Sequence, residues 1–248
     1  MSPHQTSGQA PGARCRLTIL FTDLVGSTTL GREMEAEDFA TLLHDLREIC
    51  RAAVAARGGA IARMQGDGAT IVFGHPAAGE DDGRRAVDAA LEIHEKVGAM
   101  RPEGLPARLL PLRMHSGIHA GTALISDGDI EKGVFDLVGD VPNVAARLSQ
   151  RAAPGQVLAS ADAVGPNAHF FRMGALADLS GAGFDQPVHV VLGRSEATSR
   201  FESTATVGSR PSSDEGSTSI ICRPSCAPPR PRRAPWSFPG APGSARRA

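Results

Sequence analysis

The 248-residue chain is long enough for one domain with its own hydrophobic core and further sequence beside it. Its formal net charge of -1 gives no electrostatic basis for binding nucleic acid or an anionic membrane, so we expect neither as a partner. The four irregularly spaced cysteines match neither a disulfide framework nor a zinc site, and no secretion signal or membrane-spanning run is apparent, so we expect a cytoplasmic protein.

The composition divides the chain into three parts. Residues 1–13 are mostly polar or small, and we expect a flexible N-terminus there. Residues 14–195 alternate apolar strand and helix patterns and form the expected folded domain. Residues 196–248 are rich in Pro, Ser and Arg and lack a periodic apolar pattern, so they bury too little surface to offset the entropy of ordering. We therefore expect a disordered tail.

Strand and helix patterns alternate through the folded part. The apolar run Leu17–Phe21 predicts a buried strand, and apolar residues at spacings of three and four between Phe39 and Val54 predict a helix. The later predicted elements are strands over 61–65 and 70–73, a helix beginning at 80–82, a hairpin of strands 112–118 and 122–125 around Ala120-Gly121, a strand over 134–138, a helix over 141–151, and strands over 156–159, 170–173 and 188–192. This order is typical of an α+β sandwich of the ferredoxin-like (βαββαβ) type.

Two carboxylates lie where predicted strands end. Asp23 follows the strand over 17–21, and Asp67 lies in the tight turn Gly66-Asp67-Gly68. A carboxylate beside a buried strand is unfavourable unless it is solvated, paired or bound to a metal. Two carboxylates on one sheet edge repel unless a divalent cation lies between them. Taken alone, Gly66-Asp67-Gly68 is better explained as an ordinary turn.

Two predicted helix starts carry polar groups. Val25-Gly26-Ser27-Thr28 opens a helix whose free amides suit phosphate oxygens, although Ser27 or Thr28 is equally typical of an N-cap. Pro142 fits the first turn of the helix over 141–151. Asn143 and Arg147 are four residues apart and so share one face of that helix, where an ordinary surface pair is the common explanation.

Taken together and in this order, three segments resemble the catalytic domain of class III adenylate/guanylate cyclases. They are Thr18–Thr28, Gly66–Gly68 and Asp136–Arg147, and the resemblance extends over roughly residues 14–193. It implies the ferredoxin-like fold and a phosphorus–oxygen lyase that converts ATP to 3′,5′-cyclic AMP and pyrophosphate for intracellular signalling. Two divalent cations, Mg²⁺ or Mn²⁺, are implied as cofactors.

The resemblance implies a metal and phosphate site at the N-terminal motifs. Asp23 and Asp67 would hold the two cations, with the backbone carbonyl of Leu24 as a further metal ligand. Backbone amides from Gly26 to Thr28, including that of Ser27, would hold the β- and γ-phosphates.

The third motif is implied to complete the site from a second subunit. Asn143 would orient the ribose, and Arg147 would stabilise charge on the α-phosphate. In this family two catalytic domains pack head to tail, one supplying the metal carboxylates and the other the Asn and Arg. We therefore expect a homodimer.

Base selection is expected to depend on Asp136 and Arg63. Asp136 matches the position that selects the purine, and an ionised Asp only accepts hydrogen bonds, so it suits the exocyclic amine of adenine. Arg63 stands where adenylyl members usually have Lys, and it still offers donors to adenine N1. ATP is therefore the expected substrate.

Alternatives to an active adenylate cyclase remain open. Arg63, and Ser180 within Leu179-Ser180-Gly181 where the family tends to have Lys, favour a weak or inactive cyclase-fold module that binds nucleotide or regulates a partner. A guanylate cyclase is a further alternative. A diguanylate cyclase ranks last, because its Gly-Gly-Asp/Glu-Glu-Phe turn is absent.

Overall fold

The computed structural model describes residues 13–126, 136–176, 184 and 186–195. All of these lie within one unit, Met1–Ser209. The expected flexible N-terminus, except Ala13, and the expected tail over 196–248 lie outside the described residues. Within them, no helix is both long enough and apolar enough to cross a membrane.

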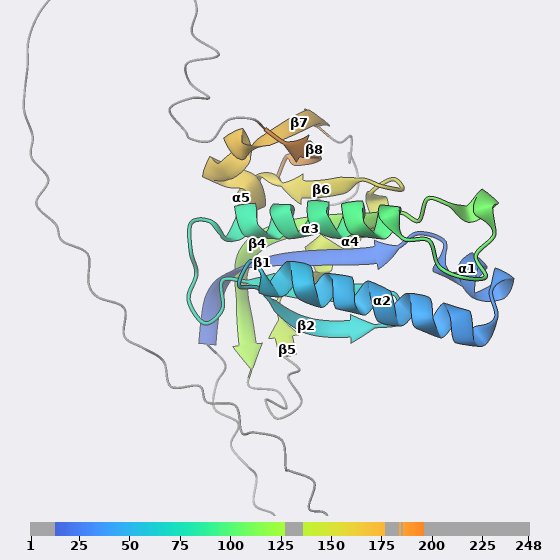
Figure 1. The fold of residues 1–248 in the computed structure, drawn as a ribbon. Helices are drawn as coiled ribbons and strands as arrows, with labels where there is room; N and C mark the ends of the chain where they lie inside the picture. Colours follow the sequence, from blue (N-terminus) through green and yellow to red (C-terminus); the bar gives the residue numbers. More distant parts are fainter. Residues whose placement is uncertain (1–12, 127–135, 177–183, 185, 196–248) are drawn as a thin grey trace, which may run out of the picture. The chain divides into compact units, whose positions relative to one another are not determined.

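The first half of the chain forms the predicted ferredoxin-like arrangement (Figure 1). Its strands have the order β2-β3-β1-β4, and every neighbouring pair is antiparallel. This is the order that a βαββαβ unit produces when both crossovers pack on the sheet. The elements are β1 (Ala13–Leu24), α1 (Ser27–Glu33), α2 (Ala36–Ala55), β2 (Ala60–Gln65), β3 (Gly68–Phe73), α3 (Asp82–Ala99) and β4 (Met114–Ser126).

The second half extends the same sheet beyond β4. β6 lies parallel to β4 and the sheet continues through β8 to β7, while β5 pairs with the far end of β4. The elements are β5 (Asp136–Val138), α4 (Val141–Arg151), β6 (Val157–Ser160), α5 (Ala161–Val164), β7 (Phe171–Leu176) and β8 (Val188–Arg194), with 3₁₀ turns at Ala107–Leu109 and Gly165–Phe170.

The predicted hairpin around Ala120-Gly121 is wrong, because β4 is one continuous strand of 13 residues. It pairs with β1 along its whole length, from Ala13 opposite Ile125 to Leu24 opposite Met114. Gly121 serves packing instead of a turn: a Cβ there would lie 2.9 Å from Cγ2 of Val141 on α4. The glycine that suggested a turn is therefore a point of close helix approach.

Helices cover both faces of the sheet. α2 and α3 lie side by side across one face, as Figure 1 shows, and bury alternate residues of β1 such as Leu20 and Leu24. Residues of the other set along β1, such as Leu17 and Ile19, pack on the opposite face in a cluster that includes Ala145 of α4. Because side chains alternate along a strand, β1 is a central strand whose residues from Leu17 to Leu24 are all buried or half-buried.

Candidate functional site

The turn between β2 and β3 closes directly onto the end of β1. Gly66 adopts φ +61°, which favours glycine, and lets the chain reverse in two residues. Gly68 leaves room for Asp23, since a Cβ there would lie 2.9 Å from Oδ1 of Asp23. Arg47 of α2 donates to the carbonyl of Gly66 at 3.2 Å and holds the turn from the helix side. Gly66, Gly68 and Arg47 therefore each help to place the turn that carries Asp67 against the end of β1.

Asp23 and Asp67 interact electrostatically in this structure. Burial raises the pKa of Asp67, and the charge of Asp23 and a hydrogen bond with it raise this pKa further, whereas a hydrogen bond with the Ser27 side chain lowers it. Two carboxylates that close together resist ionising at the same time. The arrangement brings together the two acids that the sequence analysis selected.

His115 is a member of this cluster that sequence reasoning missed. Its Nε2 lies 3.8 Å from Oδ2 of Asp23. The nearby Asp23 carboxylate raises the pKa of His115, and burial opposes that effect. The signal was the strand register: β1 and β4 pair Asp23 with His115, which only the tertiary pairing reveals.

The donor set at this end of β1 fits a hard divalent cation. In the described part of the chain, no three His, Cys, Asp or Glu side chains are grouped to hold a metal by themselves. Asp23 and Asp67 offer only oxygen, and their mutual repulsion is what a dication would relieve. Mg²⁺ is commonly held by one or two carboxylates together with substrate phosphates. Leu24, the remaining predicted ligand, is the last residue of β1 and is buried.

The predicted phosphate-binding segment lies next to the carboxylates. Gly26 adopts φ +72° and precedes α1, and no side chain caps this helix start. Ser27 is half-buried and Thr28 exposed. The Ser27 side chain lowers the pKa of Asp67, so this segment lies beside the turn that carries Asp67.

Asn143 and Arg147 lie on α4, on the other side of the sheet from α2 and α3. Asn143 is exposed and its Nδ2 donates to the carbonyl of Gly139 at 3.5 Å. The guanidinium of Arg147 lies 5.2 Å from the ring centroid of Phe184, and Nε of Arg147 is buried without a hydrogen-bond partner among the described residues. Within one described chain, no ion pair joins Arg147 to Asp23 or Asp67. The predicted site residues therefore form two groups.

The residues expected to select the base lie on edge elements. Arg63 is exposed on β2, opposite Thr70 of β3, beside a register shift that follows Ile61. Asp136 begins β5 and pairs with Ser126, and its side chain lies outside the described part of the structure. Leu179-Ser180-Gly181 also lies outside it.

Comparisons with known proteins agree on one family. Residues 13–169 match the model of the adenylate and guanylate cyclase catalytic domain. Adenylate cyclase 1 of Rhizobium meliloti is 31% identical over 140 residues, 54% of this chain and 20% of that protein. Human retinal guanylyl cyclase 1 is 25% identical over 151 residues, 60% of this chain and 14% of that protein. The chain thus spans a fifth or less of these relatives.

Solved structures show the same fold. The guanylyl cyclase Cya2 superposes with a TM-score of 0.66 at 25% identity, covering 76% of this chain and 98% of that one. The adenylyl cyclase CyaB from P. aeruginosa superposes with a TM-score of 0.60 at 22% identity, covering 76% and 97%.

Proposed function

Because the chain belongs to the family of adenylate and guanylate cyclase catalytic domains, we propose that it converts ATP to 3′,5′-cyclic AMP and pyrophosphate. The observation that carries the proposal is the meeting of Asp23 and Asp67 at one end of the sheet, with the Ser27 side chain beside Asp67. This is a paired-carboxylate site beside an uncapped helix start, as a triphosphate with its cations requires.

In the proposed reaction, Asp23 and Asp67 hold the cations, assisted by the Leu24 carbonyl. Two such cations, Mg²⁺ or Mn²⁺, would when bound lower the pKa of the ribose 3′-hydroxyl and neutralise charge on the pyrophosphate group. The amides at Gly26, Ser27 and Thr28 position the β- and γ-phosphates. No covalent enzyme intermediate is needed, since positioning and electrostatics dominate phosphoryl transfer.

Arg147 and Asn143 act on the other side of the nucleotide in this proposal. Arg147 remains charged at any physiological pH, and its planar donors suit the oxygens around the α-phosphate. The unpaired, buried Nε of Arg147 is a donor without a protein partner in the described chain, which supports a role towards an added anion. Asn143 orients the ribose.

We place these two groups on opposite subunits of a head-to-tail homodimer. Arg147 lies on α4 and has no ion pair with the carboxylates of its own described chain, so a second copy is the natural source of the missing half. Each dimer then holds two equivalent sites, as a two-fold arrangement demands.

ATP is preferred over GTP because of the proposed base contacts. An ionised Asp136 accepts from the exocyclic amine of adenine but would face the carbonyl of guanine unfavourably. Arg63, exposed at the sheet edge, is free to extend its longer, forked group toward the base. Both adenylyl and guanylyl cyclases occur among the similar proteins, so base choice is tested directly.

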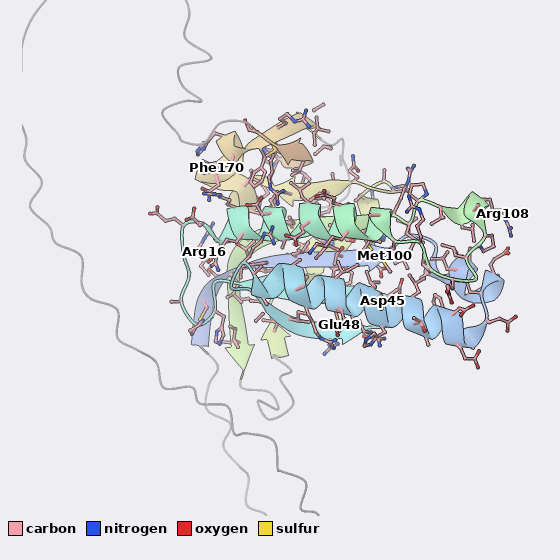
Figure 2. All side chains as sticks on the ribbon, in the orientation of Figure 1. Arg16, Asp45, Glu48, Met100, Arg108 and Phe170 are labelled. Carbon is pink, nitrogen blue, oxygen red and sulfur yellow. The ribbon has the colours of Figure 1, made fainter. Side chains whose placement is uncertain are left out.

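The test is product analysis of the purified full chain with Mn²⁺ and either ATP or GTP. We expect cyclic AMP from ATP, little cyclic GMP from GTP, and no product from Asp23→Ala. Asp45→Ala is the matched control, because Asp45 is an exposed acid near the middle of α2 (Figure 2). If neither wild type nor Asp23→Ala forms product at any protein concentration, the proposal is overturned. Nucleotide binding without product formation would favour a non-catalytic module.

A further inference from the structure

A chain of hydrogen bonds crosses the core beneath the carboxylates. Nε2 of His94 on α3 shares a hydrogen bond of 2.8 Å with Oγ of Ser116 on β4. Ser116 Oγ donates to Thr22 Oγ1 on β1, also at 2.8 Å. Thr22 Oγ1 reaches the carbonyl of His115 at 3.5 Å, a long contact. Three separate elements are therefore linked by polar side chains.

These hydrogen-bonded polar side chains have an unusual position inside the apolar core. Thr22 and Ser116 are both fully buried, and they lie among Leu20, Ile93 and Ile118 of the main cluster. Burial lowers the pKa of His94 to about 4, so the ring is neutral at neutral pH. Apolar residues of the same shape would serve stability as well, because paired buried polar groups add little net free energy. A geometric role is the better explanation for polar groups here.

This row of hydrogen bonds ends next to the proposed metal ligand, Asp23. Thr22 immediately precedes Asp23, and Ser116 immediately follows His115. β1 and β4 pair Thr22 with Ser116 and Asp23 with His115. Side chains alternate along a strand, so Thr22 faces α3 while Asp23 faces the opposite side of the sheet. Hydrogen bonds to Thr22 hold the end of β1 and so constrain the backbone from which the Asp23 side chain projects.

We propose that His94, Ser116 and Thr22 are positioning residues that hold the end of β1 so that Asp23 is aligned with Asp67 for cation binding. This inference rests on the proposed function. None of the three touches the substrate or the cations, and each acts through the backbone of β1. Outer partners that orient metal ligands typically change metal affinity or activity by about 10- to 100-fold when removed.

The fold contains a matched control for this role. Nδ1 of His119 shares a hydrogen bond of 2.9 Å with Oγ of Ser160, and both residues are buried. This pair also joins a histidine to a serine in the core, but it lies further along β4, where His119 pairs with Ile19 of β1. Ser160→Ala therefore removes the same chemistry away from the carboxylates.

The test compares Thr22→Val and Ser116→Ala with Ser160→Ala in the full chain. Mn²⁺ binding is measured by electron paramagnetic resonance titration, which needs no turnover, together with thermal unfolding and the Mn²⁺ dependence of cyclic AMP formation. We expect Mn²⁺ affinity to fall about 10- to 100-fold in the first two variants, with little change in the KM for ATP at saturating Mn²⁺. Ser160→Ala should retain wild-type Mn²⁺ affinity, and so should Thr22→Ser, which keeps the hydroxyl group.

The outcomes separate this inference from the proposed reaction. Unchanged Mn²⁺ affinity in folded Thr22→Val and Ser116→Ala overturns the positioning role, even if wild type makes cyclic AMP. Weakened Mn²⁺ binding in both variants, with a wild type that makes no product, supports positioning and contradicts the reaction. If Thr22→Val does not fold, Ser116→Ala, which loses one hydroxyl group, decides alone. A wild type that binds no Mn²⁺ overturns both.

Discussion

Burial is the largest cause of the raised pKa of Asp67, and the nearby charge of Asp23 raises that pKa further. Asp23→Asn removes the neighbouring charge that disfavours ionisation, so we expect the pKa of Asp67 to fall in the metal-free protein. Carboxyl carbon chemical shifts across a pH titration measure the change. Asp45→Asn, on the exposed side of α2, is the control and should leave Asp67 unaltered. An unaltered pKa in Asp23→Asn would show that the two acids lie too far apart to share cations.

Individual residues differ in how far the sequence alone could reveal them. Asp23 and Asp67 could be selected because their motifs occur in the order of the family resemblance, whereas Gly66-Asp67-Gly68 alone indicates only a turn, which the positive φ of Gly66 permits. His115 and Phe184 could not, since their proximity to Asp23 and Arg147 arises from strand register and from packing against α4. Contacts between distant segments leave no local pattern.

The close packing of α4 on β4 depends on glycines of β4, among them Gly117. A Cβ at Gly117 would overlap the carbonyl of Ala145 and the amide of Ser149, and neither backbone group can move without shifting the helix. Gly117→Ala should therefore lower the free energy of unfolding by about 1–3 kcal/mol or more. Gly98→Ala in α3 is the control: its Cβ would meet only the Leu112 carbonyl at 3.7 Å.

Urea denaturation measures both variants. Because alanine restricts the unfolded chain and favours helix, Gly98→Ala should be neutral or stabilise by up to about 1 kcal/mol. Equal destabilisation by the two substitutions would contradict the close approach of α4 to β4.

The same glycines explain where element prediction failed. The alternation of strands and helices, and hence the ferredoxin-like class, followed from local apolar periodicity. The false hairpin followed from treating Gly121 as a turn signal, although its function is contact with Val141 of α4. Whether a glycine permits a turn or a close approach depends on the partner element, and the sequence of the strand does not contain that information.

The stability of the whole molecule should depend on pH through His94. Its pKa is about 4 in the folded protein against 6.5 ordinarily, so between these values the unfolded chain binds more protons. Stability is therefore full above pH 6.5 and falls as the pH is lowered toward 4, by on the order of 3 kcal/mol from this group. Urea denaturation at pH 7 and pH 4.5 should show a smaller loss in His94→Gln. An identical loss would mean that His94 is not buried in its neutral form.

The proposed assembly from two copies has a quantitative consequence for activity. Asp23→Ala and Arg147→Ala should each be inactive, because every site in either homodimer lacks one half. When the two variants are mixed and exchange subunits, half of the dimers are heterodimers, and each has one site with both Asp23 and Arg147 intact. The mixture should then regain about a quarter of the wild-type rate per subunit, provided that subunits pair at random.

Rapid measurement of cyclic AMP before and after mixing tests this expectation. Mixing two preparations of Asp23→Ala is the control and should restore nothing. Activity per molecule should also rise with protein concentration as dimers form. Failure of the mixed variants to recover activity, with wild type active and concentration-dependent, would place Asp23 and Arg147 in one subunit's site and overturn the head-to-tail arrangement, because a site built within one chain cannot be repaired by a partner.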